Sequence, residues 1–204
     1  MTSKRAFEVL SRTPCFTGHA RLDRVTVRYT RHDGGWSRPV ERDLLERGHV
    51  AVVLPYDPAR DEVVLIEQFR VVAIDDPGGA WTLEAVAGVI DDGDTALATA
   101  RREAIEEAGC RIDDLLPVAH VLASPGCMTE TFAIFVGRAA TAGLGGLHGL
   151  AHEGEDIRAH VVPFADALAW VHEGRVRVAH TVLALQWLAL NRAQVLARWS
   201  RDAP

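Results

Sequence analysis

Two densely apolar segments in the first half of the chain constrain its fold more than any other feature. They are HVAVVLPY (49–56) and VVLIEQFR (63–70), and the polar turn DPARDE lies between them. Short apolar segments of this kind predict strands of a buried sheet. The same criterion predicts further strands at 81–88, 118–123, 131–139 and 157–163, and helices at about 95–108, 164–174 and 179–199. Because strands alternate with helices, we expect an α/β fold with a mixed sheet covered by helices on both faces.

The N-terminal region has a weaker pattern. Residues 16–31 alternate around Leu22, Val25, Val27 and Tyr29, which predicts a strand, and the turn at 32–35 predicts a second short strand after it. A hairpin of two strands is marginally stable in water, so this region needs another surface to pack on. A second subunit could provide that surface.

Composition limits the classes of function. The chain has 204 residues, of which 48% are hydrophobic and 25% charged, and its formal net charge is −6. These values are typical of one large globular domain, and the negative charge gives no support for a nucleic-acid or anionic-membrane partner. Three widely spaced cysteines, without a C-x-x-C pair, predict neither a disulfide framework nor a zinc site. The sequence has no apolar run long enough to span a membrane and no signal peptide, so we expect a cytoplasmic protein.

An unusual group of like charges lies in the segment RREAIEEAGC (101–110). Glu103, Glu106 and Glu107 are related by i, i+3 and i+4 on the predicted helix, so they share one face, where they repel one another. We expect Leu97, Ala100, Ala104 and Ala108 to form the neighbouring buried stripe. Clustered carboxylate oxygens are ligands that Mg²⁺ and Mn²⁺ prefer. The alternative is a glutamate-rich helix that faces solvent.

The spacing around these glutamates matches a known motif. Gly88 is followed after five residues by Asp94 and, after seven more, by REAIEEAGC (102–110). This pattern resembles the Nudix box, in which Gly, Glu, Arg-Glu, Glu-Glu and Gly recur at these fixed spacings. Asp94 replaces the first glutamate and can still cap the helix, while Ala104 and Cys110 are smaller than the usual aliphatic residues. None of these departures affects the Arg-Glu and Glu-Glu pairs.

The resemblance extends over nearly the whole chain from about residue 16. The stretches ERGHVAVVLPYDPARDEVVLIEQFR, LEAVAG, LASPG, HEGEDIR and ALQWL resemble the bacterial ADP-ribose pyrophosphatase branch of the Nudix hydrolases, and Pro125 follows the box at that branch's distance. The resemblance implies a Nudix α/β/α sandwich with a small N-terminal antiparallel β region. It also implies an intertwined homodimer, with residues 1–47 serving dimerisation and substrate contact and residues 48–204 forming the hydrolase domain.

The resemblance further implies a metal site with two or more Mg²⁺ ions, or Mn²⁺. Its ligands would be the carboxylates of Glu103, Glu107 and Glu155 and the backbone carbonyl of Ala87.

Catalytic roles follow from the same resemblance. Glu153, in the glycine-rich segment 141–156, is the candidate general base, Glu106 is a further ligand or positions water, and Arg102 orients the carboxylates. The alternatives are a surface ion pair for Arg102 and solvated loop positions for Glu153 and Glu155.

Three further residues are candidates for substrate binding. Arg42 and Arg70 carry guanidinium groups, whose planar fork matches phosphate oxygens. Glu130 follows SPGCMT and can accept a hydrogen bond from a ribose hydroxyl. For each of the three the alternative is a surface salt bridge.

The predicted function is Mg²⁺-dependent hydrolysis of the pyrophosphate bond of ADP-ribose to AMP and ribose 5-phosphate. One alternative is hydrolysis of another nucleoside diphosphate sugar such as GDP-mannose, because the box handles phosphates and not the groups beyond them. A second alternative, of a different class, is a non-catalytic module that senses ADP-ribose. The near-complete set of box carboxylates argues against the second.

Overall fold

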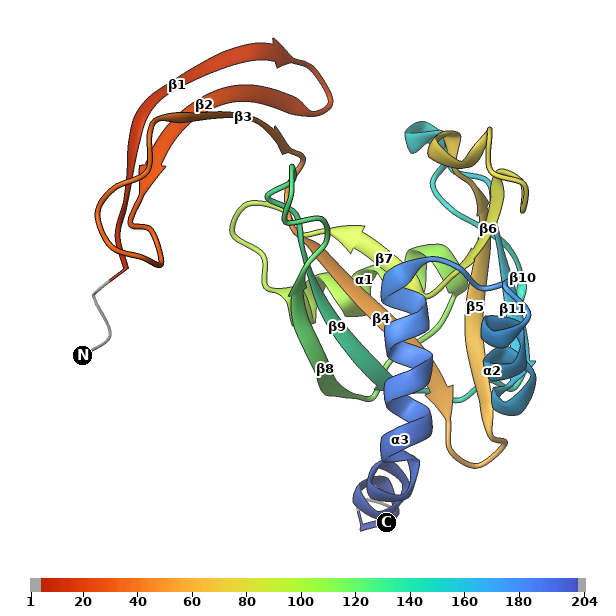
Figure 1. The fold of residues 1–204 in the computed structure, drawn as a ribbon. Coiled ribbons are helices and arrows are strands. Elements are labelled where there is room, and N and C mark those ends of the chain that lie inside the picture. Colours follow the sequence, from red (N-terminus) through yellow and green to blue (C-terminus); the bar gives the residue numbers. More distant parts are fainter. Residues whose placement is uncertain (1–4, 202–204) are drawn as a thin grey trace. The chain divides into compact units, whose positions relative to one another are not determined.

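The structure, a computed structural model, describes residues 5–201, and the chain divides into two compact units (Figure 1). The first unit contains the residues up to His49 together with Val121–Thr131. The second contains Val50–His120 and the residues from Phe132 onward. The segment Val121–Thr131 therefore belongs to the N-terminal unit, although it is distant from it in sequence.

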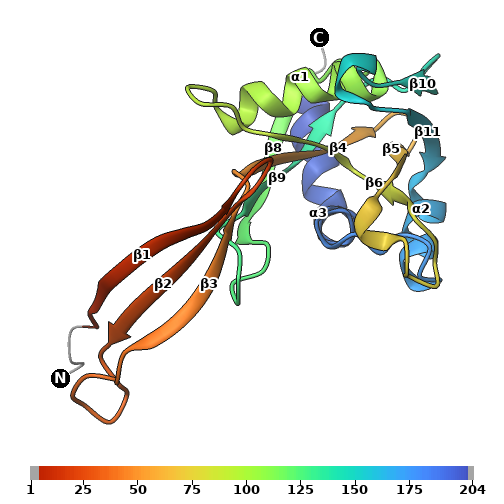
Figure 2. The same ribbon diagram turned by 90° about the horizontal axis from the view of Figure 1, so that it is seen from above.

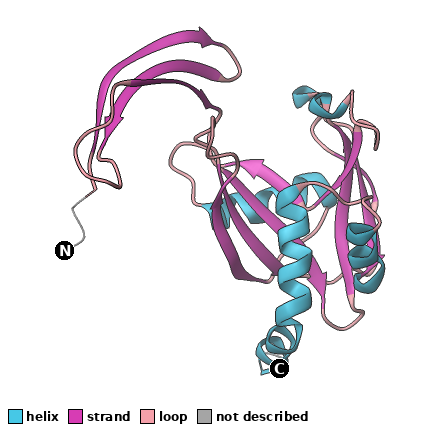
Figure 3. Cartoon of the chain, in the orientation of Figure 1, coloured by secondary structure: helices cyan, strands magenta, loops and turns pink. Residues whose placement is uncertain are grey.

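Among the described residues, the first unit contains an antiparallel sheet whose curvature is visible in Figure 3. Its strand order is β1-β2-β3. Its strands are β1 (Phe7–Thr17), β2 (Arg21–Tyr29) and β3 (Val40–Glu46). The strand predicted over 16–31 was wrong at its start, because the chain turns at Gly18, whose amide donates to the Ala20 carbonyl at 3.0 Å. β1 was missed because it is almost entirely exposed and lacks a sustained apolar alternation.

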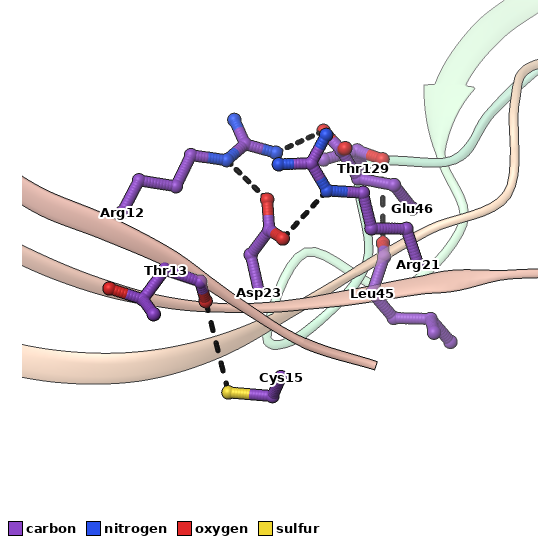
Figure 4. Close-up of polar contacts among 8 residues, drawn as sticks. All are labelled: Arg12, Thr13, Cys15, Arg21, Asp23, Leu45, Glu46 and Thr129. Atoms are coloured by element: carbon purple, nitrogen blue, oxygen red, sulfur yellow. Dashed lines mark hydrogen bonds and ion pairs between the residues drawn. The ribbon is translucent and has the colours of Figure 1, made fainter. Parts of the chain in front are cut away.

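A cluster of charges fixes the register of this small sheet. Asp23 on β2 has no exposed surface. Its carboxylate accepts a hydrogen bond from Arg21 Nε at 2.7 Å and another from Arg12 on β1, as Figure 4 shows. Arg12 also pairs with Glu46 on β3 at 2.7 Å. One buried carboxylate and its two guanidinium partners thus connect all three of these strands.

The segment Val121–Thr131 attaches to the edge of β3. Leu45 and Met128 form an isolated parallel bridge. The Leu45 amide donates to the Cys127 carbonyl at 2.8 Å, and the Thr129 amide donates to the Leu45 carbonyl at 3.1 Å. Figure 4 shows Leu45 and Thr129 in contact. These backbone bonds explain why the segment belongs to the first unit.

The second unit is built on a mixed sheet in the order β10-β11-β5-β4-β9-β8, with β6 paired to β5 and β7 paired to β4. The strands are β4 (Val50–Asp57), β5 (Glu62–Phe69), β6 (Trp81–Glu84), β7 (Val86–Val89), β8 (Asp114–Leu122), β9 (Thr131–Arg138), β10 (Gly146–His148) and β11 (Ile157–Pro163). β4 runs parallel to β9 and antiparallel to β5. β4 is buried along its whole length, as its apolar sequence predicts.

Helices cover both faces of this sheet, which confirms the predicted α/β/α arrangement. Figure 2 shows α1 (Ala96–Ala108) on one face and α2 (Phe164–His172) and α3 (Ala179–Arg201) on the other. Small residues on α1 pack into the core against apolar residues of the central strands, including Val53 and Ile66. None of the helices within residues 5–201 is long and apolar enough to cross a membrane.

Two segments differ from the sequence predictions. The strand expected at 81–88 is divided at Ala85, so that β6 pairs with β5 and β7 with β4. The Ala85 amide donates instead to the Thr181 hydroxyl at 2.8 Å. The glycine-rich segment 141–156, expected to be a loop, contains β10 and a short 3₁₀ helix at Ala151–Glu153.

Candidate active site

Helix α1 carries the acidic cluster, and both of its ends follow from the sequence. The Thr95 hydroxyl caps the start by accepting from the Ala98 amide at 3.2 Å. Gly109 ends the helix in the left-handed conformation at φ 59°, where a glycine is favoured over other residues. The predicted helix is confirmed, but its N-terminal cap is Thr95 and not Asp94, the cap that was expected from the motif.

The buried stripe of α1 differs from the prediction at one position. Ala100, Ala104 and Ala108 are fully buried, but Leu97 is half exposed. The buried positions also include a charged residue, Glu107. The core therefore takes small side chains from this helix, and the acidic face turns partly into the protein.

Glu107 is a buried carboxylate that forms no ion pair with the residues that the structure describes. It is 3% exposed, and its Oε2 accepts a hydrogen bond from the Ala87 amide on β7 at 3.0 Å. Burial, together with the charges of Glu103 and Glu155, raises the pKa of Glu107 to about 8 against the opposing hydrogen bond from Ala87. A carboxylate in this position favours a bound cation, because a cation would offset both the burial and the repulsion.

Glu103 lies directly over a glycine of the neighbouring strand. A Cβ atom on Gly88 would lie 1.9 Å from Glu103 Oε1, so only a residue without a side chain leaves room for this carboxylate. Burial raises the pKa of Glu103 to about 7, although the charge of Arg102 opposes the shift. The first glycine of the motif thus creates the space in which the glutamate lies.

Arg102 binds two of the three clustered glutamates. Its Nη1 donates to Glu106 Oε2 at 2.7 Å, and its Nη2 lies 2.9 Å from Glu103 Oε1. The guanidinium therefore contacts both carboxylates at once, which is compatible with the orienting role expected of it. Glu106 is compensated by this ion pair, whereas Glu107 is not.

Glu155 closes the base of the loop that precedes β11. Its Oε2 accepts from the Leu150 amide at 3.0 Å, and its own amide donates to the Leu150 carbonyl at 3.3 Å. The loop is attached to α1 through the Gly149 amide, which donates to the Glu106 carbonyl at 3.2 Å. The side chain of Glu153 lies outside the described residues, so its assignment as general base remains a prediction.

Arg70 directly follows β5 and lies in a two-point ion pair. Its Nε and Nη2 each donate at 2.8 Å to the two carboxylate oxygens of Glu84, which is 1% exposed. The pKa of Arg70 is raised first by these hydrogen bonds and further by the charges of Glu107 and Glu155. The predicted substrate residue thus has a buried partner, Glu84, that the sequence analysis missed. A lone glutamate in the apolar stretch WTLEAVAG was the available sign.

The other two predicted substrate residues lie in the first unit. Arg42 on β3 is exposed, and its Nη1 donates to the Glu41 carbonyl at 2.7 Å. Glu130 is 7% exposed, and its Oε1 lies 3.3 Å from Arg47 Nε. A cavity of about 570 Å³ adjoins Arg42, and its walls are formed by Tyr29, Arg31, Ser37, Arg38, Val40 and Arg42.

The carboxylates of the second unit fit a hard divalent cation. Within the part of the chain that the structure describes, no three His, Cys, Asp or Glu side chains are already close enough to hold a metal ion. The pKa values of Glu103 and Glu107 are nevertheless raised by burial and further by neighbouring negative charges. All of these side-chain donors are oxygens, as Mg²⁺ and Mn²⁺ require.

Comparison with known proteins identifies the family. The NUDIX domain model matches residues 46–202. The chain belongs to the Nudix family. Among curated Nudix relatives, "ADP-ribose pyrophosphatase" of Escherichia coli strain K12 is 45% identical over 197 residues, covering 97% of this chain and 94% of the relative.

More distant relatives agree on the family and on the fold. "GDP-mannose pyrophosphatase" of Cronobacter sakazakii is 38% identical over 174 residues, covering 83% of this chain and 88% of the relative. The solved structure described as "Crystal structure of ADP compounds hydrolase" superposes with a TM-score of 0.70 at 20% identity, covering 95% of this chain and 98% of that one. At that identity the structural likeness supports the Nudix fold alone.

Proposed function

We propose that this Nudix hydrolase cleaves the pyrophosphate bond of ADP-ribose to AMP and ribose 5-phosphate, with two or more Mg²⁺ ions, for which Mn²⁺ can substitute. The observation that carries the proposal is the buried, uncompensated carboxylate of Glu107 beside Glu103 on α1. The name of the 45% identical relative supports the choice of substrate.

The residues that would hold the cations are Glu103, Glu107, Glu155 and the Ala87 carbonyl. When bound, divalent cations supply positive charge that polarises the diphosphate and favours deprotonation of the attacking water. Arg102 holds Glu103 and Glu106 in place through its bonds of 2.9 and 2.7 Å. Without Arg102, repulsion between the glutamates would spread them apart.

Substrate contacts come from cationic and polar side chains in this proposal. Arg70 retains N–H donors that its fork to Glu84 does not use, and these are free to bind phosphate oxygens. Arg42 binds the diphosphate and Glu130 accepts from a ribose hydroxyl in this proposal. Glu153 accepts the proton of the attacking water, and Glu106 helps to position that water.

A homodimer is part of the proposal. Cross-strand pairs Phe7–Tyr29 and Val9–Val27 place apolar side chains on one face of the first unit's sheet. Phe7, Val9 and Tyr29 are 74%, 54% and 48% exposed, so a second copy would remove a large apolar area from water. Sedimentation at micromolar concentration tests this, and a fully active compact monomer would contradict it.

A cytoplasmic location is supported by the thiols. Cys15, Cys110 and Cys127 are all free, as in proteins of reducing compartments.

The experiment that tests the function is a product analysis with the purified chain. We expect AMP and ribose 5-phosphate from ADP-ribose in the presence of Mg²⁺, no turnover in EDTA, and a lower kcat/KM for GDP-mannose. A higher kcat/KM for GDP-mannose would favour the second substrate class. Tight binding of ADP-ribose without products would instead indicate a sensing module.

A further inference from the structure

Glu84 is a buried charge that none of the proposed catalytic steps uses. It is the last residue of β6 and is almost completely shielded from water. A carboxylate in such a position is costly unless its oxygens are hydrogen-bonded to a cation. Oε1 accepts from Arg70 Nε at 2.8 Å and from the Thr82 hydroxyl at 2.5 Å, and Oε2 accepts from Arg70 Nη2 at 2.8 Å.

The strand register determines how the two charged residues meet. Glu84 is paired with Ile66 and Thr82 with Gln68, while the Arg70 amide donates to the Ala80 carbonyl at 2.7 Å. The Arg70 side chain therefore runs back along β6, past Thr82, to reach Glu84. Both bonds are made by one edge of the guanidinium plane, and Nη1 is left outside the fork.

The other charges around Arg70 are the carboxylates proposed to bind the cations. Glu107 and Glu155 both act on the pKa of Arg70 after the leading contribution of Glu84, and Arg70 in turn lowers the pKa of Glu107. The Arg70 guanidinium is thus hydrogen-bonded to a buried structural carboxylate, and its charge also acts on the proposed cation ligands. Without Glu84, the positive charge of Arg70 would be drawn to Glu107 and Glu155.

We propose that Glu84 is a positioning residue, which holds the Arg70 guanidinium away from Glu107 and Glu155 and presents its free edge to the substrate diphosphate. The inference rests on the proposed function, because Arg70 is the group that would bind the diphosphate. Glu84 contacts neither substrate nor cation, and it acts through Arg70. Thr82 supports it by fixing Oε1.

The first test replaces Glu84 by Gln, which keeps the shape of the side chain but removes its charge. In Glu84→Gln we expect KM for ADP-ribose to rise about tenfold or more with kcat within about threefold, as for loss of a group that binds ground and transition states equally. We also expect Mn²⁺ binding to the substrate-free protein to weaken by about tenfold, because Arg70 would compete for the carboxylates. Unchanged KM and Mn²⁺ affinity in a folded variant would overturn the proposal.

A matched control separates positioning from stability. Asp61 forms a more exposed pair of similar geometry, accepting from the Tyr56 hydroxyl at 2.8 Å and pairing with Arg192 at 2.8 Å. Its backbone is left-handed at φ 56°, which Asn tolerates, so Asp61→Asn removes charge without backbone strain. We expect this variant to lower Tm and leave KM and Mn²⁺ affinity unchanged. An equal rise in KM in both variants would mean that Glu84 acts through stability alone.

A double-mutant cycle tests whether Glu84 works through Arg70. In an Arg70→Gln background, Glu84→Gln should add little to the increase in KM, since there is no guanidinium left to orient. Additive increases would overturn the proposal. If Glu84→Gln fails to fold, Thr82→Val serves instead, and its KM should rise about threefold through the loss of one hydrogen bond. A wild-type KM for Thr82→Val would then contradict the proposal.

The Mn²⁺ measurement also distinguishes failure of this inference from failure of the proposed function. If the wild-type chain does not hydrolyse ADP-ribose, the function is wrong, and the weaker Mn²⁺ binding of Glu84→Gln still supports the positioning role. If the wild-type chain hydrolyses ADP-ribose and Glu84→Gln binds Mn²⁺ and substrate normally, the function stands and the positioning role is wrong.

Discussion

Two buried carboxylates, one in each unit, have opposite surroundings. Asp23 in the N-terminal sheet accepts hydrogen bonds from Arg21 and Arg12, and its pKa is lowered, chiefly by the bond from Arg21. Glu107 in the second unit has one backbone hydrogen bond, and burial raises its pKa to about 8. The guanidinium groups of Arg12 and Arg21 offset the charge of Asp23, whereas Glu107 lies among other carboxylates.

The difference indicates which buried charge serves structure and which serves chemistry. A compensated carboxylate such as Asp23 has its partners within the fold and gains little from a ligand. An uncompensated one such as Glu107 reduces stability until a cation binds, which is typical of functional sites. The variants below test the contrast, from the largest expected effect to the smallest.

Glu107→Gln should have the largest effect. Loss of the buried charge should lower kcat by roughly a thousandfold, because a cation ligand is worth several kcal/mol of transition-state stabilisation. The fold should remain intact, and in EDTA the Tm should not fall, since an uncompensated buried charge has been removed. The checks are kcat at saturating Mg²⁺ and Tm by circular dichroism. Activity within tenfold of wild type would remove Glu107 from the site.

Glu153→Gln should follow, with a loss of about a hundredfold in kcat, because an amide cannot accept the proton of the attacking water. Binding of ADP-ribose should survive, since Arg42, Arg70 and the cations hold the diphosphate. The measurement is kcat together with a directly determined substrate Kd. An unchanged kcat would exclude Glu153 and leave Glu155, or water activation without a base, as the alternative.

Gly88→Ala should have an intermediate effect that is specific to the cation site. The new Cβ would lie 1.9 Å from Glu103 Oε1, so this flexible side chain must turn away. We expect the Mg²⁺ concentration for half-maximal activity to rise about tenfold, as for loss of one weak ligand contact, with little change in Tm. Gly126→Ala is the control, because its Cβ would meet no atom within 4 Å. Equal Mg²⁺ requirements in the two variants would contradict the role given to Gly88.

The parts of the molecule that were predicted from sequence are those fixed by local chemistry. Helix α1 was recognised because its glutamates recur at helical spacing. β4 and β5 were recognised because each contains a densely apolar run. The motif also indicated Arg102, whose ion pairs with Glu103 and Glu106 lie within four residues along the chain.

The parts that were missed depend on contacts between distant segments. β1 is almost entirely exposed, so it carries little of the apolar alternation by which strands are recognised. The attachment of Val121–Thr131 to the first unit depends on backbone bonds to Leu45, which have no side-chain pattern. Glu84 was missed because its partner Arg70 is brought to it by the pairing of β5 with β6.

Asp23→Asn should have the smallest effect on catalysis and completes the comparison. The amide cannot compensate Arg12 and Arg21 together, so the free energy of unfolding should fall, while kcat should change by less than about tenfold because no reacting group is lost. The folded-state pKa of Asp23 is lowered, so its stabilising contribution is fully present above its unfolded value of about 3.8 and is lost as the pH falls below that value. The Tm difference between wild type and Asp23→Asn should therefore be large at pH 7 and shrink toward pH 3. A Tm difference that stays constant over this range would show that the Asp23 charge is not what stabilises the sheet, and the contrast with Glu107 would fail.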